Sequence, residues 1–287
     1  MIEEMRPTYP LPMLCEVFSV SPSGYFEWRS RPPSTRRLED ARLAVEIKAA
    51  HRRTRESYGP ERLQSDLADH GVFVGVWRIK RLRREHGIHC KQKKKFRATT
   101  DSDHKEPVAP NLLNQDFIAV APSQIWLTDI TSIPTDEGWL YLAGHKDLYT
   151  GAIVGYAMSS RMTRNLVSQS LFQAVASKRP PAGLIHHSDR GSQYCSGEYR
   201  KLLRQFNMKT SMSRKGNCYD NAPMESFWGT LKTELTFHRR YASRQEAMRE
   251  IRTYIELFYN RQRKQRRLGY LSPAAYEQEY YKLRKAA

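Results

Sequence analysis

Three acidic residues stand in contexts that suit metal-dependent chemistry. Asp129 lies inside the β-prone segment Ile125–Ile133, where a buried carboxylate needs a cation or hydrogen-bond donors. Asp189 lies just past the short apolar segment Leu184–His187, and Glu225 lies in a helix-prone segment farther on. Three carboxylates that converge repel one another unless divalent cations bind them. Two such ions, about 3.5–4 Å apart, activate a water or a 3′-hydroxyl and stabilise the leaving oxygen of a phosphodiester.

The surrounding segments predict an order of strands and helices that would bring the three carboxylates together. Three strand-like stretches joined by short turns predict an antiparallel meander. The predicted strands lie at about 125–133, 139–148 and 151–160, followed by a helix at 165–177, a strand at 184–187, a helix at 197–206, a strand at 209–213 and a helix at 221–232. This order is that of an α/β, ribonuclease-H-like fold. In that fold the first and fourth strands are neighbours and the last helix packs across them, so Asp129, Asp189 and Glu225 converge.

The expected ligands are all oxygen atoms, which favours Mg²⁺ or Mn²⁺ over zinc. The four cysteines are far apart and form no CxxC pair, so neither a zinc knuckle nor a disulfide framework is predicted. His186 and His187 are adjacent and cannot form a His-x-x-x-His pair. A single aspartate in a strand is often satisfied by a turn or a pairing partner, so the prediction depends on the three carboxylates together.

The chain before the predicted core divides into three segments. Residues 1–35 are rich in proline and predict short helical turns and a linker rather than a domain. Residues 36–97 predict a small all-α domain, in which a glycine-bounded turn joins two short helices as in a helix-turn-helix. Residues 98–122 hold prolines among polar residues, which predicts an interdomain linker before the core at 123–287.

Two features of the helical segment lead to specific predictions. Leu38, Ala41, Val45 and Ala49 have helical spacing, which predicts a helix from Leu38 to about His51. The stretch Trp77–Arg97 contains ten Lys or Arg residues and one acidic residue. Such a surface favours contact with DNA phosphates over a merely solvated helix face. The predicted DNA contacts here are Arg78, Lys80, Arg81, Arg84, Lys93 and Lys94.

The composition agrees with a polyanionic partner. The chain of 287 residues has 48 Lys and Arg against 30 Asp and Glu, a formal net charge of +18. This balance favours nucleic acid or an anionic membrane surface. No apolar run approaches the roughly 20 residues that span a bilayer, and the N-terminus lacks the basic and apolar regions of a signal peptide. We therefore expect a cytoplasmic protein with nucleic acid as its partner and no membrane association.

Four long stretches of the sequence match one known pattern. They are IWLTDIT around Asp129, HSDRGSQY around Asp189, SRKGNCYDNAPMESFWGTLKTEL around Glu225, and the closing block YNRQRKQRRLGYLSPAAYE. Through them the chain resembles the DDE integrase/transposase superfamily, and specifically the second-reading-frame (OrfB) transposase of the bacterial insertion-sequence family numbered three. The stretches SVSPSGYFEWRSRPPS and YGPERL match as well, so the resemblance covers nearly the whole chain. Gln265 is a small departure, because many relatives have His there.

The resemblance implies a DDE-type polynucleotidyl transferase with a retroviral-integrase-type core. Two Mg²⁺ or Mn²⁺ ions would be held by Asp129, Asp189 and Glu225, and the 35 residues between the last two match the family's spacing. Lys232 lies seven positions after Glu225, on the same helix face, and is expected to contact the DNA end. Arg190, near Asp189, is expected to contact DNA too. The other contacts expected in the core and the closing block are Gln193, Arg263 and Lys264.

The resemblance also implies partners. Such enzymes act on the element ends and on target DNA, which suggests a homo-oligomer on DNA. Members of the family are fused by frameshifting to the product of an upstream reading frame (OrfA), so fusion or association with that product is expected. Two alternatives stay open at this stage: a ribonuclease-H-like nuclease or resolvase without strand transfer, and a non-catalytic DNA-binding regulator. A labelled element end with a target plasmid separates them, because only a transposase yields joined product.

Overall fold

A five-stranded mixed sheet in the order β3-β2-β1-β4-β5 forms the centre of the structure. The structure is a computed structural model, and it describes residues 1–91, 108–214 and 217–286. The strands are β1 (Ile125–Thr135), β2 (Gly138–Asp147), β3 (Ile153–Ser159), β4 (Ile185–Ser188) and β5 (Lys209–Met212). The first three pair antiparallel, whereas β4 pairs parallel to both β1 and β5. The predicted ribonuclease-H-like order, with the first and fourth strands adjacent, is therefore confirmed.

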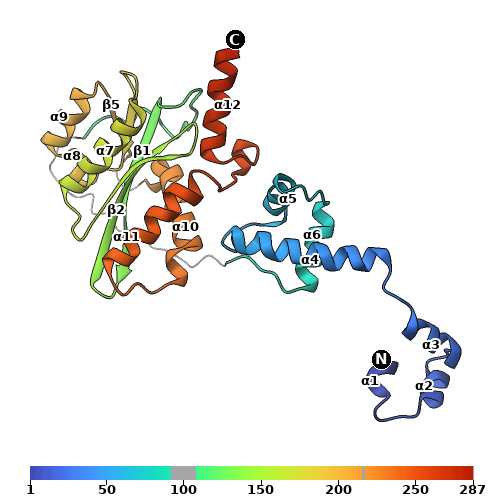
Figure 1. Cartoon of the computed structure of the whole chain (residues 1–287). Coiled ribbons are helices and arrows are strands. Elements are labelled where there is room, and N and C mark those ends of the chain that lie inside the picture. The colour runs from blue at the N-terminus through green and yellow to red at the C-terminus, as the bar shows by residue number, and fades with distance from the viewer. Residues whose placement is uncertain (92–107, 215–216, 287) are drawn as a thin grey trace.

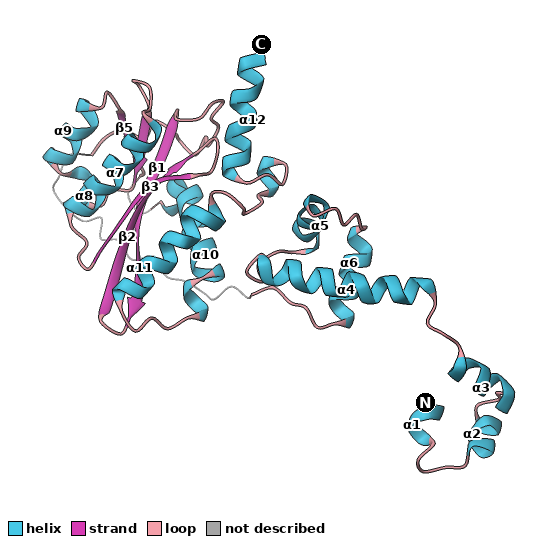
Figure 2. Ribbon diagram, in the orientation of Figure 1, coloured by secondary structure: helices cyan, strands magenta, loops and turns pink. Residues whose placement is uncertain are grey.

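Helices cover both faces of this sheet (Figure 2). One face carries α7 (Arg164–Lys178), α8 (Ser192–Cys195) and α9 (Gly197–Gln205), and the other carries α10 (Ala222–Glu234) and α11 (Arg244–Thr253). Successive residues of a strand point to opposite faces, so Trp126 packs among the first group and Leu127 among the second. A β-carbon added at Gly155 would lie 2.5 Å from the backbone oxygen of Ser170, which shows how closely α7 lies against β3.

Three buried histidines lie on strands β2 and β4 of the sheet. His145 of β2 bonds to Ser170 Oγ through Nδ1 (2.8 Å), and its Nε2 lies 3.1 Å from Nε2 of His186 in β4. His187 is buried as well and bonds to Ser211 Oγ at 2.8 Å. Burial lowers the pKa of His145 well below its usual value, that of His186 to about 3 and that of His187 to about 4. All three are therefore neutral in the folded protein near neutral pH.

The helix-turn-helix-like region is a three-helix unit of α4 (Thr35–Arg53), α5 (Pro60–Asp69) and α6 (Val76–Glu85). Its predicted all-α character, the helix predicted from Leu38 to about His51 and the turn between α5 and α6 are confirmed. Leu38 and Val45 are exposed, whereas Ala44, Ile47 and Ala50 are buried. This helix has apolar residues on two sides, so helical spacing alone did not select one. Contact with α5 and α6 decides which side is buried.

This unit is packed against the end of the chain. After α11 the chain forms a π-helical segment, η3 (Tyr254–Tyr259), and after the single turn η4 (Arg266–Leu268) it ends in α12 (Pro273–Ala286). Tyr58, buried between α4 and α5, accepts a hydrogen bond from the backbone nitrogen of Lys264 at 2.6 Å and donates one to the Gln262 carbonyl at 3.3 Å. One apolar cluster runs across the contact.

The first thirty residues form a separate small unit. It consists of α1 (Ile2–Met5), α2 (Leu11–Val17) and α3 (Pro22–Ser30), which lie apart from the other helices in Figure 1. The helical turns expected from the prolines are present, and they pack around the buried Tyr25, whose hydroxyl donates to Glu3 at 2.6 Å. No helix in the described part of the chain is long and apolar enough to cross a membrane.

The buried histidines predict a loss of stability in acid. Their folded-state pKa values lie below the unfolded value of about 6.5, so the unfolded chain binds more protons once the pH falls below that value. Each histidine should cost about 1.4 kcal/mol of unfolding free energy per pH unit below about pH 6, until its folded pKa is reached. Urea unfolding between pH 8 and 4.5 measures this slope. His186→Asn should flatten it by about one proton, whereas a replacement of the exposed His86 by Gln should leave it unchanged. An identical slope in His186→Asn and the wild type would contradict the prediction.

Candidate active site

Asp129 lies in the middle of β1 with both carboxylate oxygens engaged. Its Oδ1 accepts the backbone N–H of Ile130 at 2.8 Å, and its Oδ2 accepts the indole N–H of Trp228 at 3.0 Å. Trp228 belongs to α10, so this bond ties the strand to the helix that carries Glu225. The carboxylate is therefore held in one orientation by two donors from different elements.

The helix α10 reaches Asp129 because the neighbouring strand has no side chain in its way. Asp129 pairs with Gly144 across the β1–β2 ladder. A β-carbon at Gly144 would lie 2.9 Å from Cε of Met224 and 3.0 Å from Cη2 of Trp228. These distances are shorter than ordinary carbon contacts, so any larger residue would push α10 away from the sheet at the level of Asp129.

Asp189 is brought beside Asp129 by the register of the parallel strands. Leu127 pairs with His187, and each aspartate lies two residues farther along its own chain. Asp189 Oδ1 accepts the backbone N–H of Gly191 at 2.9 Å. Both aspartates line one cavity of about 80 Å³. Burial raises the pKa of Asp129 well above its usual value, and the nearby charge of Asp189 raises it further.

Glu225 lies in the first turn of α10 but does not line that cavity. Its side chain is exposed, yet partial desolvation raises its pKa, and its charge adds to the rise in the pKa of Asp129. Within residues 1–91, 108–214 and 217–286, no three His, Cys, Asp or Glu side chains lie close enough to hold one metal ion. The structure thus brings two of the three predicted carboxylates together and leaves Glu225 at the edge of the site.

Family models match almost the whole chain outside the first helices. A model for the integrase core domain matches residues 119–218, another for the integrase core domain matches 225–280, and one for an HTH-like domain matches 37–96. The transposase InsF of insertion sequence IS3A from Escherichia coli strain K12 is 38% identical over 278 residues, which cover 96% of each chain. The chain belongs to the IS3 family of insertion-sequence transposases. It is accordingly a polynucleotidyl transferase with an integrase core.

Two further similarities are recorded for this IS3-family transposase. The uncharacterized 31 kDa protein of insertion element IS600 from Shigella sonnei is 60% identical over 270 residues, which cover 94% of this chain and 99% of that protein. Among solved structures, the HTLV-2 integrase catalytic core domain in complex with magnesium (trimeric form) is 15% identical with a TM-score of 0.45, and the match covers 56% of this chain and 99% of that one.

Lys232 of the transposase lies on α10 one turn beyond Trp228 and is only 4% exposed. Burial lowers its pKa to about 8, although the negative charge of Asp129 works in the opposite direction. Lys232 is therefore buried and near enough to Asp129 for the two charges to interact. Its contact with a DNA end stays a prediction.

Arg190 and Gln193 lie beside Asp189. Arg190 Nε donates to the Ser213 carbonyl at 2.7 Å, and Gln193 Nε2 donates to the Met162 carbonyl at 3.3 Å. Gln193 also lines the cavity shared by the two aspartates. Both side chains are half-buried at the site, and their predicted DNA contacts remain predictions.

Arg263 and Lys264 are both buried and paired with carboxylates. Arg263 is 7% exposed and its guanidinium bonds to both carboxylate oxygens of Glu234 at 2.8–3.0 Å. Lys264 is 8% exposed, donates to Ser65 Oγ at 2.9 Å and pairs with Asp69 at 2.5 Å. Both charges are paired where the closing block meets α10 and α5, and the predicted DNA contacts of these two residues stay predictions.

The basic residues of α6 divide into two groups. Arg78 and Arg81 bond to Asp40 of α4 at 2.8 and 2.6 Å. Lys80 and Arg84 are exposed, and no ion pair to them is found within the described ranges. The carboxylate that pairs with Arg78 and Arg81 thus comes from another helix, and the predicted DNA contacts of all four residues stay predictions. Lys93 and Lys94 lie outside the described residues.

Sequence reasoning missed two residues that shape the site, Trp228 and Gly144. Trp228 lies three positions after Glu225, so helical spacing places both on one face of α10 and could have suggested it. Gly144 lies in a buried strand, where a glycine often marks a close approach of another element. Neither signal predicts a hydrogen bond to Asp129.

We predict that Trp228→Phe slows strand cleavage. The phenyl ring keeps part of the packing, but Asp129 loses one of its two donors, and loss of a group that orients a metal-site carboxylate typically costs about 10- to 100-fold. The measurement is the cleavage rate of a labelled element end at saturating DNA, with the melting temperature as a check on folding. Trp139→Phe is the matched control, since Trp139 is 53% exposed on β2. Equal rates for the two variants would contradict the prediction.

Proposed function

We propose that Asp129, Asp189 and Glu225 are the catalytic residues of this transposase and together hold two divalent ions, Mg²⁺ or Mn²⁺. The proposal rests on one observation: Asp129 and Asp189 line the same small cavity, where the negative charge of one carboxylate makes ionisation of the other less favourable. Two carboxylates that stay close in a partly buried site favour a cation between them. The magnesium named for the similar HTLV-2 integrase core supports the choice of metal.

The donor set fits such ions. The three side chains offer only oxygen atoms, which suit Mg²⁺ or Mn²⁺. The nearest histidines, His186 and His187, are directed to Tyr199, Ser211 and Ser213 inside the core and supply no nitrogen ligand. When bound, two such ions activate the attacking water or 3′-hydroxyl and stabilise the leaving oxygen.

The protein's own groups then have distinct roles in the proposed reaction. Ile130 and Trp228 orient Asp129, and the backbone N–H of Gly191 orients Asp189. Lys232, buried beside Asp129, offers a positive charge to the phosphate backbone of the bound DNA end. The product expected from a transposase is a joined strand, which distinguishes it from a nuclease with the same ligands.

We predict that Asp129→Asn, Asp189→Asn and Glu225→Gln each abolish cleavage and joining, a loss of at least ~100-fold by comparison with groups that only support metal ligands. Each change removes a charged ligand with little change in shape, so DNA binding should persist. The assay uses a labelled element end, a target plasmid and Mg²⁺, with gel shift for binding. Asp116→Asn, at an exposed aspartate, should keep full activity. Full activity of Asp189→Asn would contradict the assignment of the three carboxylates as catalytic residues.

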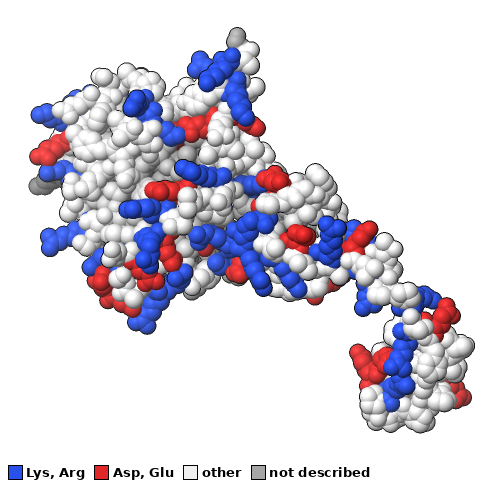
Figure 3. Space-filling model, in the orientation of Figure 1, with Lys and Arg blue, Asp and Glu red and all other residues white. Residues whose placement is uncertain are grey.

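We also propose that α6 contacts duplex DNA through one face. Trp77 is 82% exposed, and Lys80 Nζ lies 4.8 Å above its ring. Arg84 follows one turn after Lys80, so the three side chains share a side of the helix. Ion pairs to Asp40 direct Arg78 and Arg81 toward α4 instead. On the face drawn in Figure 3, Lys and Arg side chains are numerous along α4 and where it approaches the core.

We predict that Lys80→Ala with Arg84→Ala weakens DNA binding and lowers its salt dependence by roughly two counterions, because each phosphate contact contributes about one. Fluorescence anisotropy at several salt concentrations gives the slope. Lys201→Ala with Arg204→Ala removes the same charge from exposed positions of α9 and serves as the control. An equal loss in both double variants would show that general charge, not α6, accounts for the binding.

Domain borders and partners complete the proposal. The borders are an N-terminal segment at 1–35, the helix-turn-helix-like domain at 36–97, the linker at 98–122 and the core at 123–287, in line with the family models. We propose that the transposase works as a homo-oligomer on DNA and together with the upstream-frame product. Gel shift and cleavage of candidate inverted repeats, with and without that product, test the second point.

A further inference from the structure

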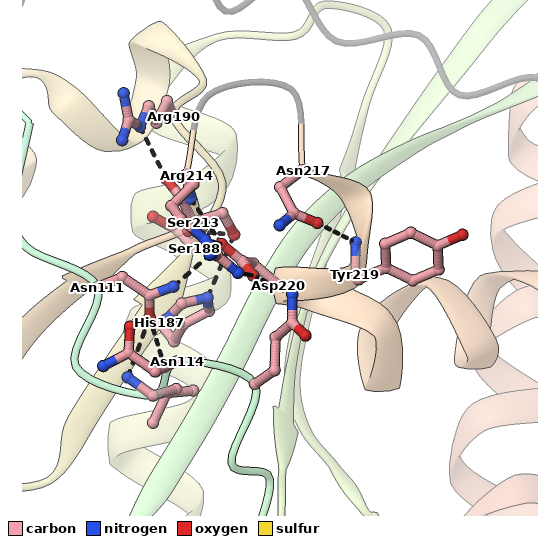
Figure 4. A network of polar contacts seen from close by, with 12 residues as sticks. Asn111, Asn114, His187, Ser188, Arg190, Ser213, Arg214, Asn217, Tyr219 and Asp220 are labelled. Atoms are coloured by element: carbon pink, nitrogen blue, oxygen red, sulfur yellow. Dashed lines mark hydrogen bonds and ion pairs between the residues drawn. The ribbon is translucent and has the colours of Figure 1, made fainter.

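The side chain of Asp220 accepts more hydrogen bonds than any other carboxylate in the described part of the chain. The sequence predicted no role for it. Its side chain is buried and accepts five hydrogen bonds (Figure 4). Arg214 supplies three of them, from its backbone nitrogen (2.8 Å), Nε (3.0 Å) and Nη2 (2.9 Å). Asn111 and Gln115 supply the others through their side-chain amides at 3.0 and 2.9 Å. The bond from Arg214 holds the pKa of Asp220 far below its usual value, so it is ionised at neutral pH.

One side of this network reaches Asp189. Arg214 directly follows Ser213, whose backbone nitrogen donates to the Ser188 carbonyl at 2.9 Å. The Ser213 carbonyl in turn accepts Nε of Arg190 at 2.7 Å. The two residues that flank Asp189 are therefore both bonded to the residue that precedes Arg214, as Figure 4 shows.

The other side of the network reaches Glu225. Asp220 lies in a 3₁₀ turn, η1 (Cys218–Asn221), that leads directly into α10. The next residue, Asn221, donates through Nδ2 to the Thr128 carbonyl at 3.2 Å, one residue before Asp129. Glu225 follows in the first turn of the helix. Asp220 thus connects the chain beside Asp189 to the start of the helix that carries Glu225.

A role in simple packing does not account for this arrangement. Burial of an ionised carboxylate is costly unless donors surround it, and the donors here come from two segments outside η1. Arg214 follows the end of β5 beside Asp189, whereas Asn111 and Gln115 belong to the predicted linker. Removal of Asp220 would leave the guanidinium of Arg214 and two amides without their shared acceptor.

We propose that Asp220 is a positioning residue that fixes the placement of Glu225 relative to Asp189. The inference rests on the proposed metal-binding role of those two carboxylates. Its mechanism is the pairing of Asp220 with Arg214, which joins the end of β5 to η1 and so determines where α10 begins. Asp220 itself does not contact DNA or metal in this role.

The test compares Asp220→Ala and Asp220→Asn with Arg214→Lys, which keeps the charge but loses the two-point bond. Asp136→Asn is the matched control, because Asp136 pairs with Arg240 on the surface, where the arginine side chain is 86% exposed. The first measurement is amide hydrogen exchange of the metal-free protein. Both Asp220 variants should accelerate exchange in the first turn of α10 and leave α7 unchanged. Equal loss of protection in α7 and α10, or no change in α10, would overturn the proposal.

The second measurement is single-turnover strand transfer at saturating DNA. Asp220→Asn should lower the rate by about 10- to 100-fold, as for other groups that support metal ligands, with unchanged DNA affinity. Mn²⁺ should restore part of the rate, because Mg²⁺ demands nearly ideal octahedral geometry, and Arg214→Lys should lie between wild type and Asp220→Asn. An unchanged rate would overturn the proposal. Full activity of Asp189→Asn would instead overturn the metal-site assignment, while the exchange result would still stand for the placement of α10.

Discussion

The parallel pairing of β1 with β4 determines where chemistry can take place in this transposase. Because Leu127 lies opposite His187, Asp129 and Asp189 occupy equivalent positions and face one cavity. A shift of one residue in that register would turn one carboxylate to the opposite face of the sheet. Burial and the like charge of Asp189 both raise the pKa of Asp129, so interactions elsewhere must hold the register that brings the two carboxylates together. The contact of His145 in β2 with His186 in β4, which spans β1, and the β4–β5 pairing supply them.

The second half of the site depends on one helix approached from several directions. At its start, Asn221 bonds to β1 and Asp220 bonds to Arg214. In its middle, Trp228 reaches Asp129 over Gly144. At its end, Glu234 accepts bonds from Arg263 and Tyr254 in the closing segment. That segment also holds the helix-turn-helix-like unit through Tyr58. The helix with Glu225 therefore contacts the sheet and the closing segment. The closing segment in turn connects it to the helix-turn-helix-like unit.

Much of this architecture was predictable from the sequence, and the exceptions have a common cause. Strand alternation and element order placed Asp129, Asp189 and Glu225 on the right elements, because those signals are local. The partners of charged residues were not predictable in the same way. Arg263 bonds to Glu234, 29 residues earlier, and Arg78 bonds to Asp40, 38 residues earlier. Charge counts along the chain do not reveal pairs that form only in the folded protein. The buried side of α4 was not predictable for a related reason, since its two apolar stripes differ only in what packs against them.

The absence of a side chain at Gly144 restricts which residues can stand at positions 224 and 228. The space above it is filled by Met224 and Trp228, so a side chain can be added at 144 only where a smaller residue stands at 228 or 224. In related transposases these positions should therefore vary together, with bulk on the strand balanced by loss of bulk on the helix. Where the smaller residue stands at 228, the first aspartate must be oriented by some group other than an indole. The residue at position 144 in each family member thus indicates whether an indole at position 228 can orient the first catalytic aspartate.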